Sequence, residues 1–255
     1  MIVIPAIDIR GGRCVRLIQG DFARERVYED DPAAVARRLG ESGAHRIHLV
    51  DLDAARGLID LASATAARRV LETAQEVGVE VEVGGGVRTL AAAERWLAAG
   101  AAFVVLGSVA VREPEAAAAI CAALPGRCLV ALDVRGDTAQ AEGWTEGAGS
   151  AVAHLERWAA WPLAGLVRTD VALDGMLTGP DLAGLEQTVR AFPGPVIASG
   201  GVSTVDDIVR CAEAGAAGAI VGRALYEGSF DLRAAILRFP GEPGRFPPTI
   251  PGARS

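Results

Sequence analysis

The sequence contains no lysine, so all 25 of its basic residues are arginine. A lysine Schiff base cannot form in this chain, which excludes class I aldolase chemistry and lysine-anchored pyridoxal phosphate. The four cysteines show no CxxC spacing and no nearby histidine cluster, so they predict neither a zinc site nor a disulfide framework. We therefore expect no bound metal and a reducing, cytoplasmic environment.

Aromatic residues are also scarce, at 5% of the chain, although 51% of the residues are hydrophobic. The core must then be built mainly from alanine, valine, leucine and isoleucine. No apolar run approaches 18 uncharged residues, and the opening segment MIVIPAIDIRGG does not resemble a signal peptide, so we expect no membrane partner. The net charge of −7 leaves no broad basic face, which argues against a nucleic-acid partner.

Short apolar runs alternate regularly with helical patterns along the 255 residues, a length typical of one (βα)₈ barrel. Strands that alternate with helices and are buried on both faces predict an α/β protein with a parallel sheet. A doubly wound open sheet would show the same alternation. We predict strands near Ile2–Ile7, Arg46–Val50, Val79–Val83, Phe103–Leu106, Arg127–Leu132, Leu166–Arg168, Pro195–Ala198 and Ala219–Val221.

Helix ends and a change of composition divide the chain further. The segment from Phe239 onward holds five of the 13 prolines, so we assign residues 1–238 to one catalytic domain and 239–255 to a Pro/Gly-rich tail. Three helices have both a predicted N-cap and a predicted glycine stop: Asp31 with Gly43, Thr89 with Gly100, and Thr204 with Gly215.

An internal repeat favours closure of the sheet. The segments VEVGGGVRTLAAAERWLAAGAAFVVLGS and VIASGGVSTVDDIVRCAEAGAAGAIVGR align without a gap, and AIDIRG aligns with ALDVRG. The two halves of the chain therefore look like copies of one four-stranded unit. This pattern predicts a TIM barrel with a two-fold internal (half-barrel) repeat.

Two aspartates occupy matching places in this repeat. Asp8 ends the first predicted strand and Asp133 ends the fifth. Strands one and five are opposed in an eight-stranded barrel, and active sites of such barrels lie at the carboxyl ends of the strands. Either aspartate alone could simply satisfy a turn amide. Their recurrence instead favours a pair of carboxylates in unlike environments, one acting as base and the other as acid.

Glycine-rich turns follow strands three, four, seven and eight. Glycine lets the backbone approach an anion, and a following helix offers free N–H groups. A single turn of this kind needs no ligand, but two symmetric pairs predict two phosphate sites. The candidate residues are Gly85, Gly86, Gly107 and Ser108 in one half, and Ser199, Gly200, Gly201, Gly222 and Arg223 in the other.

Weaker candidates lie in the remaining loops. We interpret VRLIQGD, with Arg16 and Gly20, as part of a long first loop that acts as a lid. The three histidines form no metal-ligand or triad pattern, and we interpret them as structural. Further candidate contacts after strands two, five and six are Asp51, Trp144, Thr169, Asp174 and Gly175.

Taken together, these segments resemble the ProFAR isomerases of histidine biosynthesis, where ProFAR is phosphoribosylformimino-aminoimidazole carboxamide ribotide. The resemblance runs from Met1 to about Ile236. It rests on the segments IPAIDIRGGRCVRLIQGD, IHLVDLD, VEVGGGVRT, VVLGS, ALDVRG, GW, TDVALDG, SGGVS and IVGRALYEG.

The resemblance implies an Amadori rearrangement, in which an aminoaldose becomes an aminoketose without metal or organic cofactor. The substrate would be a bis-phosphorylated ribonucleotide, in keeping with two phosphate sites. By analogy, Asp133 would be the general acid that opens the ribose ring, assisted by Thr169. Asp8 would take the C2′ proton, and Asp174 would contribute conditionally. We expect a monomer.

Three alternatives stay open. The sister cyclase barrel of the same pathway also uses two aspartates, but it normally opens with a lysine-containing stretch. A bifunctional isomerase that also acts on phosphoribosylanthranilate commonly has arginine before the Gly-Trp pair, where this chain has Glu142. A non-catalytic phosphate-binding barrel would be expected to lack Asp8 or Asp133. Leu173, at a place where the family commonly has arginine or lysine, puts the contacts of the sixth loop in doubt.

Overall fold

Eight parallel strands form a closed ring in the computed structural model, which describes residues 1–18, 21–141, 144 and 146–241. The first barrel strand pairs with the last on one side and with the second on the other, so the sheet has no free edge. The (βα)₈ barrel is thereby confirmed and the open sheet excluded. In ring order the strands are β1 (Ile2–Arg10), β4 (Arg46–Asp51), β5 (Glu80–Gly84), β6 (Phe103–Leu106), β7 (Cys128–Arg135), β10 (Gly165–Asp170), β11 (Val196–Ser199) and β12 (Gly218–Val221).

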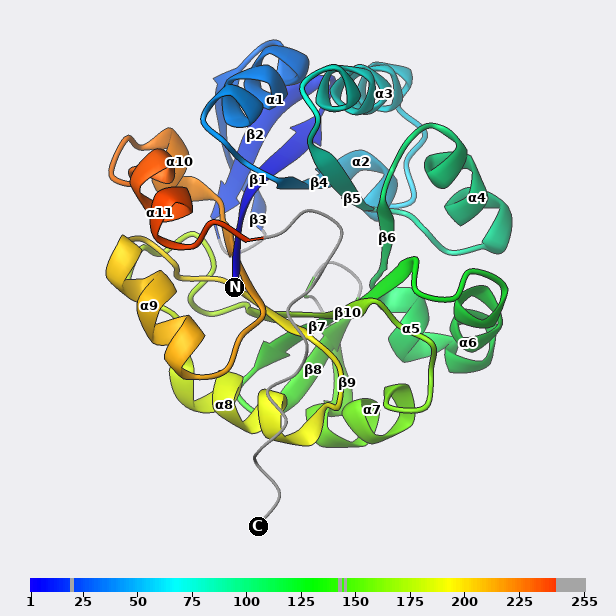
Figure 1. Cartoon of the computed structure of the whole chain (residues 1–255). Helices are drawn as coiled ribbons and strands as arrows, with labels where there is room; N and C mark the ends of the chain where they lie inside the picture. The colour runs from blue at the N-terminus through cyan, green and yellow to red at the C-terminus, as the bar shows by residue number, and fades with distance from the viewer. Residues whose placement is uncertain (19–20, 142–143, 145, 242–255) are drawn as a thin grey trace.

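Helices surround the strands on all sides (Figure 1). The helices are α1 (Pro32–Glu41), α2 (Leu52–Ala55), α3 (Leu61–Glu76), α4 (Leu90–Ala98), α5 (Ser108–Arg112), α6 (Pro114–Ala123), α7 (Ala151–Trp158), α8 (Leu182–Ala191), α9 (Val205–Glu213), α10 (Arg223–Tyr226) and α11 (Leu232–Arg238). Those from α1 to α9 lie in the connections between successive barrel strands, whereas α10 and α11 follow the last strand.

The predicted helix caps are confirmed. Asp31 and Thr89 each accept a hydrogen bond from the first turn of their helix, and Thr204 forms a capping box with Asp207. The predicted stops adopt the left-handed backbone conformation that glycine tolerates, for example Gly100 with φ +105°. These local signals therefore determine where the barrel helices begin and end.

Two antiparallel hairpins extend the barrel, one after β1 and one after β7. β2 (Arg13–Ile18) and β3 (Asp21–Glu29) form the first, while β8 (Thr138–Ala141) and β9 (Glu146–Ser150) form the second. The interpretation of VRLIQGD as a long lid loop was wrong in this respect, because Arg16 lies within β2. Backbone pairing between β1 and β2 holds this segment as an extension of the sheet. Gly20 lies outside the described residues.

The core has an inner and an outer layer of apolar side chains. An inner cluster that includes Ile4, Leu129 and Ile220 fills the barrel, and outer clusters pack between strands and helices. Strand residues alternate between these layers, since successive side chains point to opposite faces. On β4, Ile47 and Leu49 pack outward, which directs their neighbours into the barrel. Aliphatic groups thus fill much of the barrel interior below the site, together with the buried polar side chains of Arg46 and Glu82.

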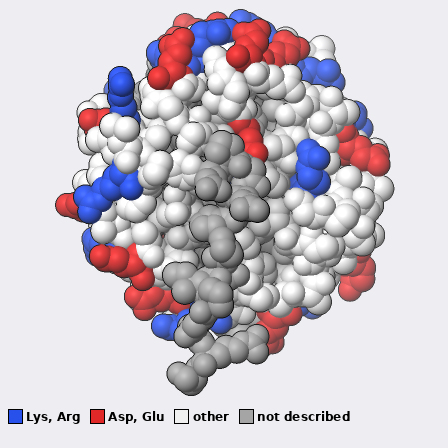
Figure 2. Space-filling model, viewed as in Figure 1, with Lys and Arg blue, Asp and Glu red and all other residues white. Residues whose placement is uncertain are grey.

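Acidic and basic side chains are interspersed around the periphery of the face in Figure 2. Among the described residues, no helix is long and apolar enough to span a bilayer. All four cysteines are buried and unbridged. The last described helix ends at Arg238, and the division into residues 1–238 and 239–255 stays a prediction.

Candidate active site

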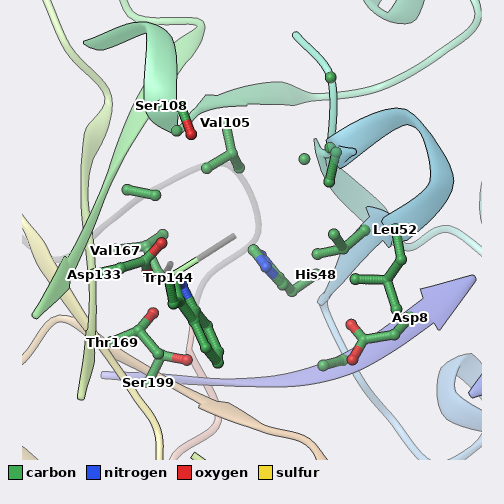
Figure 3. A pocket seen from close by; sticks show the side chains of 18 of the residues that line it. Asp8, His48, Leu52, Val105, Ser108, Asp133, Trp144, Val167, Thr169 and Ser199 are labelled. Atoms are coloured by element: carbon green, nitrogen blue, oxygen red, sulfur yellow. The ribbon is translucent and has the colours of Figure 1, made fainter. Parts of the chain in front are cut away.

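A cavity of about 230 Å³ opens at the carboxyl ends of the barrel strands (Figure 3). Its lining includes Asp8 on β1 and Asp133 on β7. These two strands lie four places apart in the ring of eight, so they are diametrically opposed. The two carboxylates therefore reach one cavity from opposite walls, as Figure 3 shows.

Asp133 sits beside groups that shape its acidity. Its strand position is paired with that of Thr169 on the adjacent β10. Burial raises the pKa of the Asp133 carboxyl, and hydrogen bonds from the side chains of Trp144 and Thr169 offset part of this shift. The nearby Asp174 carboxylate raises the pKa further. The environment thus favours the protonated form of Asp133 more than water does, which suits a proton donor.

On the opposite wall, Arg16 joins two carboxylates. Its Nη1 lies 2.6 Å from Asp8 Oδ2, and its Nη2 lies 2.6 Å from Asp174 Oδ1. Burial opposes the charge of this guanidinium, but the carboxylates of Asp174 and Asp8 outweigh it and raise the pKa of Arg16. Burial also raises the pKa of Asp174, with Arg16 acting against the shift. Asp8 thus has an ion-pair partner that stabilises its carboxylate, whereas Asp133 has hydrogen-bond donors instead.

The first glycine cradle, which we define as Gly84–Gly86, Gly107 and Ser108, lines the cavity at the ends of β5 and β6. A Cβ on Gly85 would lie 2.9 Å from the carbonyl carbon of Asp51 and closer still to its oxygen. Gly85 also has φ +93°. Glycine is therefore required there by two independent constraints, a left-handed backbone and close packing against the end of β4.

The second glycine cradle, defined as Ser199–Gly201, Gly222 and Arg223, lines an adjoining recess at the ends of β11 and β12. A Cβ on Gly200 would lie 2.6 Å from the carbonyl oxygen of Asp170, so this turn is packed as closely as the first. Arg223 Nη1 donates to the carbonyl oxygen of Gly175 at 2.6 Å. Because β5–β6 and β11–β12 are opposed in the ring, the two cradles lie on opposite sides of the barrel mouth.

Other predicted residues have different roles in the fold. Asp51 caps α2 by accepting from Ala54 N at 3.0 Å, and it lies outside the cavity lining. Asp174 and Gly175 line the second recess, and Trp144 lines the main cavity with φ +71°, unusual for a residue with a Cβ. The structure therefore brings most predicted site residues together and leaves Asp51 in a capping role.

Sequence reasoning missed two of the cavity's polar side chains, His48 and Arg88. His48 on β4 projects into the cavity between the walls that carry Asp8 and Asp133 (Figure 3), although we interpreted it as structural. Arg88 follows the first cradle and donates to the carbonyl oxygens of Ala54 and Ala55. His48 precedes Leu49 on the same strand, and successive side chains of a strand point to opposite faces. An outward-facing Leu49 therefore indicates that His48 faces into the barrel. For Arg88, the signal was that the second glycine cradle contains an arginine, Arg223, whereas no basic residue had been assigned to the first cradle.

No group of three or more histidine, cysteine, aspartate or glutamate side chains arranged to hold a metal ion occurs within the described part of the chain. The chemistry that these residues can perform is proton transfer. Two carboxyl groups in different surroundings flank a cavity whose two ends are lined by closely packed backbone and arginine. Such a site suits a molecule with an anionic group at each end.

The fold and site thus define a (βα)₈-barrel protein with opposed carboxylates and paired glycine cradles. The family described as "Histidine biosynthesis protein" matches residues 2–231, and the chain belongs to this family. The predicted family relationship is confirmed.

Curated relatives cover nearly the whole chain. A protein from Desulfosudis oleivorans is 44% identical over 240 residues, which cover 92% of this chain and 94% of the relative. One from Roseiflexus sp. is 46% identical over 237 residues, covering 92% and 98%. One from Paracoccus denitrificans is 42% identical over 238 residues, covering 92% and 98%. All three are named 1-(5-phosphoribosyl)-5-((5-phosphoribosylamino)methylideneamino) imidazole-4-carboxamide isomerase.

Proposed function

We propose that this chain is a ProFAR isomerase of histidine biosynthesis, which converts the bis-phosphorylated aminoaldose ProFAR into its aminoketose. The observation that carries the proposal is the placement of Asp8 and Asp133 on opposed strands around one cavity. The identity of 40–46% to isomerases of this name over most of the chain supports the choice of substrate.

The reaction needs a proton at one position and loses one at another. Asp133 donates its proton to the ring oxygen of the ribose, the C1′–O bond breaks, and the amine nitrogen stabilises the resulting carbocation as an iminium. Asp8 then removes the proton from C2′, which gives an enaminol that tautomerises to the ketone. The molecular formula is unchanged, because one proton enters and one leaves, so no redox cofactor is required.

The protein supports these steps through acidity and geometry. The raised pKa of Asp133, caused first by burial, keeps a larger fraction of the carboxyl group protonated, and Thr169 orients it. Arg16 holds Asp8 in place and stabilises its negative charge. Each phosphate group occupies one cradle, with Arg88 at the first and Arg223 at the second. This arrangement fixes the ribose between the two carboxyl groups, and orientation of this kind is a major part of catalysis.

Substitution of the two carboxyl groups tests the proposal. We expect Asp8→Asn and Asp133→Asn each to reduce turnover of ProFAR by at least about 10²-fold, the usual contribution of an acid or base. Both variants should still bind a product analogue, because the cradles are untouched. The exposed Asp137→Asn serves as the matched control and should retain full activity. Substantial turnover by either active-site variant contradicts the assignment.

The same assay with phosphoribosylanthranilate separates one activity from two. Glu142, on which the preference for one activity rests, lies outside the described residues. The monomeric state and the cytoplasmic location also stay predictions. Binding of the product analogue without turnover of either aminoaldose by the unmodified chain would favour a non-catalytic phosphate-binding barrel.

A further inference from the structure

A column of polar side chains lies inside the lower part of the barrel, where apolar groups would be expected. Glu82 on β5 is completely buried, with 0% of its surface exposed. Arg46 on β4 is 2% exposed, and His48 stands above it on the same strand. Burial of a carboxylate is costly unless hydrogen bonds or opposite charges compensate it. The column therefore has a cost that aliphatic side chains of similar size would avoid.

Each oxygen of Glu82 faces a different neighbour. Glu82 Oε1 lies 2.7 Å from His48 Nδ1, and Glu82 Oε2 lies 3.7 Å from Arg46 Nη1. Arg46 also donates from Nη2 to Glu80 at 2.7 Å and lies over the ring of Phe103 at 4.3 Å. The permanently charged guanidinium balances a carboxylate at Glu82. A carboxylate only accepts hydrogen bonds, so His48 Nδ1 must be the protonated nitrogen of this contact.

This contact determines which nitrogen the ligand meets. With Nδ1 turned toward Glu82 on the neighbouring strand, Nε2 is the nitrogen left to face the cavity that His48 lines. Figure 3 shows the ring projecting between the sides that carry Asp8 and Asp133. In the proposed reaction, the sugar ring with its hydroxyl groups lies between these two carboxyl groups. An imidazole nitrogen fixed at this place is positioned to bind one of those hydroxyl groups and so to hold the sugar between Asp133 and Asp8.

We propose that Glu82 is a positioning residue, which orients His48 with Nδ1 protonated so that Nε2 binds a hydroxyl group of the substrate sugar. This inference rests on the proposed isomerase function. It assigns to Glu82 a role in the reaction that acts through another side chain, without contact with the substrate. Partners that orient a metal-ligating histidine typically contribute about 10–100-fold to metal affinity or activity, and we expect an effect of similar order for the substrate-binding role proposed for His48.

Two substitutions of Glu82 weaken its hydrogen bond to His48 to different extents. Glu82→Gln keeps the shape, but its amide can either accept from Nδ1 or donate to it, so both imidazole tautomers become populated. Glu82→Met has a similar volume and no hydrogen-bonding partner for Nδ1. We expect kcat/KM for ProFAR to fall by about tenfold in the glutamine variant and by up to about 100-fold in the methionine variant. The decrease should lie mainly in kcat, because the phosphate cradles still bind.

The imidazole itself supplies a readout that a merely structural role would not change. In ¹⁵N-labelled protein, the His48 signals, identified by their absence in His48→Asn, should show protonated Nδ1 in the unmodified chain and a tautomer mixture in Glu82→Gln. Glu80→Gln is the matched control, since Glu80 binds the same Arg46 without contacting His48. It should lower thermal stability at most, and leave the tautomer and kcat/KM unchanged.

A double-mutant cycle decides between positioning and simple stabilisation. If Glu82 acts through His48, Glu82→Gln should have no further effect on kcat in the His48→Asn background. Additive losses, or an unchanged His48 tautomer in Glu82→Gln with full activity, overturn the inference even if the unmodified chain is an active isomerase. Absence of turnover by the unmodified chain refutes the proposed function instead. Should Glu82→Met fail to fold, the glutamine variant and the cycle still decide.

Discussion

Replacing Asp133 by asparagine should make the protein more stable at neutral pH. Burial raises the pKa of this carboxyl group, with Asp174 adding to the shift and the hydrogen bonds from Trp144 and Thr169 opposing it. The folded state therefore binds the Asp133 proton more tightly than the unfolded chain, in which the pKa of an aspartate is about 4. As the pH rises from about 4 through the folded-state pKa, Asp133 must lose this proton at a growing cost to folding. Asparagine has nearly the same shape and never ionises. Its amide oxygen can accept from one donor, and the Thr169 hydroxyl can turn to accept from its NH₂ group.

We expect Asp133→Asn to raise the free energy of unfolding by about 1 kcal/mol at pH 8, a usual gain when a destabilising active-site group is removed. This corresponds to an increase in Tm of about 2–4 °C for a domain of this size. As the pH falls below 4 and both states become protonated, the difference should shrink towards zero. Urea unfolding of the two proteins between pH 3.5 and 8 measures this, with the exposed Asp137→Asn as the control. A variant that is less stable than the parent at pH 8, or a difference that does not depend on pH, would refute the account of Asp133 as a partly buried acid with a raised pKa.

Two further predictions separate the folding role of the cradle glycines from their binding role. Gly85→Ala should lower the free energy of unfolding by about 3 kcal/mol, since a positive φ costs about 1 kcal/mol or more and overpacking against the Asp51 backbone adds a similar amount or more. Gly136→Ala, also at positive φ but with nothing within 4 Å of its Cβ, controls for the backbone term, and equal losses in urea unfolding would rule out the packing contribution. Gly107→Ala should lower the free energy of unfolding by less than Gly85→Ala does, because a Cβ at Gly107 would meet nothing within 4 Å. It should nevertheless weaken binding of a product analogue in calorimetry by about tenfold, or about 1.4 kcal/mol, and unchanged affinity would place the phosphate elsewhere.

The barrel could be predicted because its signals are local and recur along the chain. All eight barrel strands lie within a few residues of their expected positions, and the caps at Thr89 and Thr204 begin the helices as expected. The two hairpins were missed for a physical reason. Strands β2 and β3 carry many charged residues, and they are strands because β2 continues the pairing at the end of β1. Pairing of this kind depends on the tertiary arrangement, which a window of sequence does not contain.

The candidate site also contains residues that could be predicted from the sequence and residues that could not. The opposition of Asp8 and Asp133 followed from counting strands, since ring order places the ends of β1 and β7 across the barrel from each other. His48 and Asp51 could not be assigned by such counting. Both stand near the carboxyl end of β4, yet one lines the cavity and the other caps α2. The difference depends on side-chain direction and on the turn that follows, which motif positions do not describe.

Arg16 shows how closely the predicted parts of the site depend on one another. We interpreted Gly222 as part of a phosphate site, and its place in the second cradle fits that role. A Cβ at Gly222 would also lie 2.8 Å from the guanidinium carbon of Arg16, the side chain that joins Asp8 to Asp174. The absence of a side chain at this position therefore accommodates the ion pairs of Arg16 with Asp8 and Asp174, and in the proposed function it also leaves room for a phosphate group. A substitution there would displace Arg16 and disturb Asp8, so the proposed anion site and the proposed proton-transfer site cannot be altered independently on this side of the barrel.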